Sequence, residues 1–195
     1  GHHKSIGQHI MKILFNLLIT SLMALIIALA FGAYNMAATE KHWEITEKFI
    51  ERMRESSIDV RSRDLTVPSL DATDMLSAGA EHYHEMCTIC HLAPGMKPTE
   101  LSVGLYPRAP IFHEGEPISD NTERLARART YFWVIKNGLK MTAMPAWGLS
   151  HSDDDIWGMT AFILKLGKMT PEHYQELTHS AQHETHDHDH KHGSH

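Results

Sequence analysis

The sequence predicts an all-α protein, and three observations lead to this prediction. Apolar residues recur at helical spacing in several segments of the 195-residue chain. Helix start and stop residues bound these segments, as with Ser152 and Asp155 at capping-box spacing and Asn137 with Gly138 at a C-terminus. No alternation of polar and apolar residues is long enough to predict a strand. We therefore expect one folded helical domain with appendages.

An apolar segment near the N-terminus predicts a membrane anchor. Residues 13–33 carry no charge and are long enough to cross a bilayer as a helix. Lysines within residues 1–12 and acidic residues after the segment predict a cytoplasmic N-terminus. The small residues 28–30 leave open a cleaved signal peptide, but the length of the segment favours an uncleaved anchor.

Residues 34–73 are predicted to form a juxtamembrane helix followed by a tether. Residues 39–56 have helical spacing with one apolar flank, and Thr39 is the expected N-cap. This helix either packs on the following domain or lies at the membrane interface with Trp43 among the lipid headgroups. Residues 57–73 lose the helical period and contain Pro68, which is typical of a tether.

A compact domain of three main helices is predicted over residues 74–170. Its first helix carries Gly79, and the cost of glycine in a helix indicates close approach by the last helix, with an aromatic side chain filling the gap. Asn121 or Thr122 is expected to cap the start of the second helix. The proline-rich residues between these helices read as an irregular loop wrapped over a cofactor. The expected inner faces are Met75, Ala78, Gly79, Tyr83 and Met86; Leu125, Ala128, Phe132 and Ile135; and Ile156, Met159, Ile163 and Leu166.

The segment Cys87-Thr88-Ile89-Cys90-His91 has the spacing of a c-type haem attachment site. Two thiols three positions apart reach the two vinyl groups on one edge of a porphyrin, and the histidine supplies an axial nitrogen. The sequence has no other cysteine, which excludes a zinc site that needs a second ligand pair. No βαβ pattern supports a redox dithiol. We therefore predict one covalent haem c with His91 as an iron ligand.

Six-coordinate iron needs a second axial ligand, for which we predict Met144. Pro145 follows it and disfavours helix there, so that Met144 is held in an extended loop. A helix separates Met144 from His91, which allows its loop to approach from the opposite side. Met141 lies on the same loop and is the alternative ligand, whereas Met86 and Met159 lie on inner helix faces and are expected in the core.

These motifs resemble class I c-type cytochromes, and in particular membrane-anchored bacterial monohaem cytochromes. The class I resemblance covers residues 74–168 and rests on residues 87–91, 137–138, 144–148 and 152–157. The resemblance to membrane-anchored monohaem cytochromes rests on residues 34–44 and 104–108. It implies three to five helices around one haem with histidine and methionine ligands. It also implies a backbone carbonyl at or near Pro94 that orients the His91 imidazole.

Arg108 and Trp147 are candidate partners for the haem carboxylates. A cation or an indole N–H neutralises or hydrogen-bonds buried carboxylates. The alternative is a surface arginine and a packed tryptophan.

The C-terminal residues 171–195 are predicted to be a flexible tail. They hold eight of the seventeen histidines, several of them beside aspartates. Such a composition suits Zn²⁺, Ni²⁺ or Cu²⁺. The tail is therefore interpreted as a solvated segment with incidental metal affinity, and a metal buffer is the alternative.

Together these features predict an electron carrier of the bacterial inner membrane rather than an enzyme. The net charge of −6 without a basic run argues against a nucleic acid partner. Haem c attachment is completed outside the inner membrane, so the haem domain is expected in the periplasm. A dehydrogenase donor and a terminal oxidase or reductase acceptor are the expected redox partners, met in short-lived complexes. A cytochrome subunit of a stable oxidoreductase complex and a haem enzyme or sensor with a labile sixth ligand are the alternatives.

Overall fold

The computed structural model describes residues 2–179, and this part of the chain contains helices and loops but no strand. The all-α prediction is therefore confirmed. The chain forms two compact units, Gly1–His42 and Trp43–His195. The first unit consists mainly of α1 (His2–Ala30), whose part Ile6–Ala30 is long and apolar enough to span a membrane. A signal sequence near the N-terminus fits the same description.

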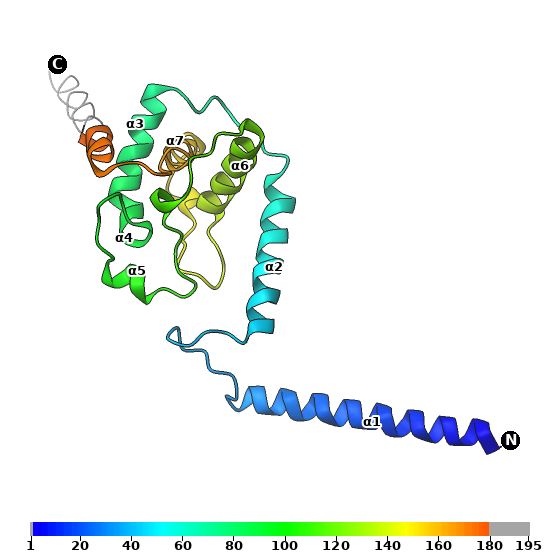
Figure 1. Ribbon diagram of the computed structural model, residues 1–195. Helices are drawn as coiled ribbons and strands as arrows, with labels where there is room; N and C mark the ends of the chain where they lie inside the picture. The colour runs from blue at the N-terminus through cyan, green and yellow to red at the C-terminus, as the bar shows by residue number, and fades with distance from the viewer. Residues whose placement is uncertain (1, 180–195) are drawn as a thin grey trace. The chain divides into compact units, whose positions relative to one another are not determined.

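The core of the second unit is built from three helices, with α7 (Asp153–Ile163) between α3 (Thr73–His82) and α6 (Asn121–Asn137) (Figure 1). All α7 residues from 156 to 163 are buried, because α7 is apolar on nearly all sides. On α6 the predicted inner residues Ala128, Phe132 and Ile135 are buried as expected.

The crossing of α3 and α7 depends on two glycines. A Cβ atom on Gly79 would lie 2.0 Å from the carbonyl oxygen of Gly158, so the two backbones are in direct contact. The predicted crossing is confirmed, but the Gly158 backbone, rather than an aromatic side chain, fills the space beside Gly79. The predicted inner face of α3 was wrong at Ala78, which is exposed, while Ala80 is buried.

The helix starts follow ordinary capping chemistry. Asp120 caps α6 by accepting a hydrogen bond from the Glu123 N–H at 2.7 Å, so the predicted caps Asn121 and Thr122 were wrong by one or two residues. At α7 the predicted capping box is confirmed, with the Ser152 hydroxyl accepting from the Asp155 N–H at 3.2 Å.

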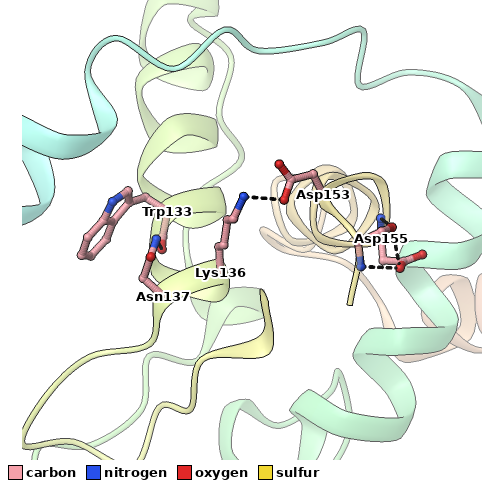
Figure 2. A network of polar contacts seen from close by, with 6 residues as sticks. Trp133, Lys136, Asn137, Asp153 and Asp155 are labelled. Atoms are coloured by element: carbon pink, nitrogen blue, oxygen red, sulfur yellow. Dashed lines mark hydrogen bonds and ion pairs between the residues drawn. The ribbon is translucent and has the colours of Figure 1, made fainter. Parts of the chain in front are cut away.

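An ion pair joins the end of α6 to the start of α7. Lys136 Nζ lies 2.6 Å from Asp153 Oδ1, as Figure 2 shows. On the same turn of α6 the Asn137 amide donates to the Trp133 carbonyl oxygen at 2.8 Å. The Lys136–Asp153 ion pair thus holds together the two helix ends that flank residues 138–152.

The segment predicted as a tether is instead part of the fold. Helix α2 (Glu44–Ser62) packs against α6 and begins after Trp43 rather than Thr39. Residues 63–72 then cross α6, where Leu70 is only 3% exposed and the Leu65 carbonyl accepts from Arg129 Nε at 3.0 Å. Arg124 also pairs with Asp71 at 2.8 Å. The sparse apolar residues of this segment have no period, which is why its packing was missed.

The first residues of the predicted tail also belong to the fold. Residues 171–179 are helical, and the buried Tyr174 ring packs beside Phe162 with ring centroids 6.1 Å apart. The Tyr174 hydroxyl lies 3.1 Å from His84 Nδ1. The remaining tail histidines, and with them the predicted metal affinity, lie outside the described residues.

Candidate functional site

The attachment motif sits where α3 changes its winding. α3 passes into the π-helical turn η1 (Tyr83–Cys87), which is followed by the short helix α4 (Thr88–His91). Single π-helical turns inside helices are frequent at functional sites. The wider turn presents Cys87, Cys90 and His91 on consecutive short elements, and all three side chains are partly buried.

The Tyr83 side chain stabilises the turn that follows the motif, at Leu92. The ring is fully buried and its hydroxyl donates to the Leu92 carbonyl oxygen at 2.7 Å. Burial raises the pKa of this tyrosine well above its usual range, so the hydroxyl keeps its proton. Leu92 has a positive φ of 59°, and the hydrogen bond helps to hold this residue in a conformation that leucine rarely adopts.

The two thiols are neutral at ordinary pH. Burial, followed by the proximity of Cys90, raises the pKa of Cys87 to about 12, and burial also raises that of Cys90. A reactive redox dithiol has a lowered thiol pKa, so these cysteines do not fit that class. In addition, the described residues contain no cluster of three histidine, cysteine or acidic side chains that would hold a metal ion.

His91 is held by the loop that follows α5 (Glu100–Gly104). Its Nδ1 lies 2.8 Å from the Pro110 carbonyl oxygen, and since a carbonyl only accepts, Nδ1 carries the proton. Phe112 stacks on the imidazole with ring centroids 4.8 Å apart. Burial lowers the pKa of His91, while the hydrogen bond to Pro110 opposes this shift. The result is a neutral ring whose Nε2 has a free lone pair.

The orienting carbonyl was predicted at or near Pro94, and that prediction was wrong. The partner of His91 Nδ1 is Pro110. Pro94 is buried in the tight turn that leaves α4, where the Ala93 carbonyl accepts the Met96 N–H at 2.9 Å. The carbonyl beside the imidazole therefore comes from the loop after α5 and not from the turn that directly follows the motif.

Met144 lies in a closed loop at the end of α6. Gly138 ends the helix with a φ of 65°, and the Leu139 N–H donates to the Met144 carbonyl oxygen at 3.2 Å. The Thr142 hydroxyl accepts from the Met144 N–H at 3.1 Å. Met144 is half-buried against the core, whereas Met141 is 69% exposed.

Gly138 and Gly148 allow this loop to lie against α6. A Cβ on Gly138 would come within 2.8 Å of the Met144 carbonyl oxygen, and one on Gly148 within 2.8 Å of the Lys136 carbonyl oxygen. Gly148 belongs to the turn η3 (Trp147–Leu149). Trp147 is half-buried and meets His151 edge-on at 5.5 Å between ring centroids, whereas Arg108 is exposed.

The compact unit is similar to one described family. Residues 74–163 match the family model for cytochrome c oxidase, cbb3-type, subunit III. This part of the chain is a c-type cytochrome domain. Neither a curated protein nor a solved structure shows significant similarity to the chain. A c-type cytochrome domain carries covalent haem c, and Cys87 and Cys90 have the spacing that its attachment requires.

The residues of the cytochrome domain fit this cofactor. A neutral imidazole with a free Nε2 is the form that binds iron, and the loop of Met144 offers a thioether sulfur from a different part of the chain. The raised pKa values of the two thiols argue against a thiolate metal site, and it is the spacing of Cys87 and Cys90 that fits haem attachment.

Three contributors to the cytochrome domain had no clear signal in the sequence. Pro110 acts through a backbone carbonyl, which any residue possesses. Phe112 packs on His91 from a loop without helical or strand periodicity. Thr142, which holds the Met144 N–H, was recognisable only as a hydroxyl residue two positions before that methionine.

Proposed function

We propose that this protein is a membrane-anchored electron carrier in which His91 and Met144 ligate a single haem c. The observation that carries the proposal is the hydrogen bond from His91 Nδ1 to Pro110, because it fixes the ring with Nε2 free. The bound haem supplies one-electron chemistry between ferrous and ferric iron. The chain supplies the fixed ligands and a partly buried setting.

The loop geometry supports Met144 rather than Met141 as the second ligand. Met144 is half-buried and its N–H is held by Thr142, whereas Met141 points largely into solvent. A thioether ligand stabilises ferrous iron more than a second imidazole does, and so it raises the reduction potential. Such a site is suited to electron transfer without substrate binding.

Replacement of each methionine in turn tests this assignment on the full-length holoprotein. Met144→Ala is expected to abolish the weak long-wavelength band of thioether-bound ferric iron and to lower the reduction potential. Met141→Ala is the matched control, because it removes the same side chain from the same loop, and it should leave both unchanged. Retention of the band in Met144→Ala, with its loss in Met141→Ala, would show that the ligand is Met141.

We also propose that α1 remains uncleaved in the bacterial inner membrane, with the cytochrome domain in the periplasm. The side chains of Ile6–Ala30 are exposed in the structure, including large ones such as Leu18 at 67%, and so much exposed apolar surface supports a lipid environment for this helix. The mass of the mature holoprotein tests this directly. It should equal the full chain plus one haem, and a mass that lacks the N-terminal segment would show cleavage.

Exposed apolar side chains on α4 and α5, close to the motif, support short-lived contacts with redox proteins. Ile89, Leu101 and Val103 are all exposed, and the Thr99 hydroxyl at the start of α5 donates to the Ile89 carbonyl, which holds α5 beside α4. Exposed apolar side chains in an otherwise polar surface are typical of weak, transient interfaces. A dehydrogenase as donor and a terminal oxidase or reductase as acceptor are the partners we propose.

A subunit of a stable oxidase complex is the second candidate function. The description of the matching family favours it, since that family is named for a subunit of cbb3-type oxidase. Mild detergent extraction of native membranes distinguishes the two functions. Stoichiometric copurification of oxidase subunits would support the complex, whereas a holoprotein that elutes alone would support the carrier.

A further inference from the structure

Helix α2 leaves a row of apolar side chains on its outer face. Ile45, Phe49, Met53 and Val60, here called the α2 apolar row, are between 50% and 78% exposed. Their spacing of four, four and seven residues places them on one side of the helix. The partly or fully buried residues of α2 lie on another side and are Thr46, Ile50, Arg54, Ser57, Ile58 and Ser62. The row is therefore not part of the interior of this unit.

Basic side chains border the α2 apolar row along one edge. At about 100° per residue, Arg52 and Lys48 lie on the side of Phe49 that faces away from the buried residues. The acidic residues Glu44, Glu47, Glu51 and Glu55 lie more than about 100° from Phe49. Asp59 lies between Lys48 and Arg52 on the basic side, where it pairs with Arg63, and Lys48 pairs with Glu44. An apolar row with a basic edge is the pattern of a helix that lies in the surface of a bilayer containing anionic lipids.

We propose that the α2 apolar row docks on the surface of the membrane in which α1 is anchored, so the proposal rests on that anchoring. Only residues 31–43 connect the end of α1 to the start of α2, and thirteen residues span at most about 45 Å when fully extended. The row is thus confined near the lipid headgroups at a high effective concentration. From residue 45 to residue 60 it extends about 22 Å along the helix, enough for a contact that lies flat.

Docking of α2 would also orient the cytochrome domain. Residues 63–72 hold α2 to the core through the Arg124–Asp71 ion pair and the Arg129–Leu65 hydrogen bond. α2 itself packs against α6. The domain would therefore present a defined side to membrane-bound redox partners, instead of rotating freely at the end of a tether.

Spin labels on the full-length holoprotein test the docking. Haem attachment consumes Cys87 and Cys90, so one added cysteine accepts a nitroxide selectively. Phe49→Cys and Met53→Cys place labels in the row, and Glu51→Cys and Glu55→Cys are matched controls on the acidic side of α2. The proteins are reconstituted, with the haem reduced, in phosphatidylcholine vesicles with and without phosphatidylglycerol.

Labels at positions 49 and 53 are expected to be several-fold less accessible to a water-soluble nickel chelate, and more accessible to oxygen, than those at 51 and 55. Equal nickel accessibility at all four positions would overturn the proposal and leave a protein partner as the occupant. Protection accompanied by spin–spin broadening that disappears on dilution with lipid would overturn it in favour of a second copy. Phosphatidylglycerol should increase the protection, and no change would exclude a role for the basic edge.

Alkaline extraction of the same vesicles separates this proposal from the anchoring on which it rests. Release of the chain from the vesicles would mean that the anchoring itself fails. Retention of the chain with water-exposed labels at 49 and 53 would mean that only the docking fails.

Discussion

Replacement of Gly79 by alanine is expected to force α3 and α7 apart. The new Cβ would lie 2.0 Å from the Gly158 carbonyl oxygen and 2.4 Å from the Gly158 carbonyl carbon, while ordinary contacts begin near 3.4 Å. Both opposing atoms are backbone, so no side chain can rotate away. The helices would have to separate by more than about 1 Å at their closest point.

Two opposing effects set the size of the loss. Alanine is more favourable than glycine inside a helix by about 1 kcal/mol. Overpacking of a tight core typically costs about 1–3 kcal/mol. Part of this cost arises because separated helices leave a gap between core residues such as Ala80 and Met159. A gap of 0.5–1 Å removes roughly a quarter to a half of the dispersion attraction between facing atoms. Because both opposing atoms are backbone, we expect a cost at the upper end of this range, about 3 kcal/mol. After the gain of about 1 kcal/mol from helix propensity, the expected net loss in the free energy of unfolding is about 2 kcal/mol. For a folded unit of about 140 residues (43–179) this lowers Tm by roughly 7 °C.

Thermal unfolding of the full-length holoprotein, followed by far-ultraviolet circular dichroism, measures this loss. Gly104→Ala is the neutral control, because no atom lies within 4 Å of its added Cβ. Gly158→Ala should fall between the two, since its Cβ would meet the Met75 carbonyl oxygen at 3.0 Å. If Gly79→Ala unfolds at or above the wild-type temperature, as helix propensity alone predicts, the close-contact explanation is refuted.

Three further substitutions test other parts of the fold by urea unfolding of the holoprotein. Tyr83→Phe should cost about 1–2 kcal/mol, because the buried Leu92 carbonyl loses its donor, and an unchanged midpoint would contradict that role. Leu70→Ala should lower the free energy of unfolding by about 2–4 kcal/mol if residues 63–72 are packed as described. A loss below about 0.5 kcal/mol would instead support the interpretation of this segment as a tether. The hydrogen bonds from Ser152 lower the pKa of Asp155, so its stabilisation is present at neutral pH and is lost as pH falls through the folded-state pKa. Asp155→Ala should therefore be less stable than wild type near neutral pH, with a difference that disappears in acid; a difference independent of pH would exclude the carboxylate as its source.

The core helices could be predicted because their signals are local. Ser152 and Asp155 predict the start of α7, because they form its capping box. Gly138 predicts the end of α6, because glycine readily adopts the φ of 65° found there. The haem attachment motif is equally local, since the two thiols and the histidine lie within residues 87–91, at the junction of η1 and α4. Gly79 indicated a close helix crossing because glycine has a cost that only tight packing offsets.

The parts that were missed depend on contacts between distant segments. Residues 63–72 looked like a tether because Leu65 and Leu70 have no period, yet Arg129 and the core beneath α6 hold them in place. Likewise, the orienting carbonyl for His91 comes from Pro110, at a position set by the course of α5 and the following loop. A backbone carbonyl leaves no trace in residue identity, so its position cannot be read from the sequence.

The way in which the two proposed ligands are held supports an electron carrier over an enzyme with a labile sixth ligand. His91 is fixed by the Pro110 carbonyl, and the Met144 loop is closed by hydrogen bonds to Leu139 and Thr142. Gly138 lets that loop lie against its own backbone so closely that no side chain would fit between. If Met144 ligates the iron as proposed, a loop braced in this way would resist the displacement that opens a coordination position, and it would keep the ligand in a similar place in both oxidation states. Small rearrangement on gain or loss of an electron is the property that a carrier requires.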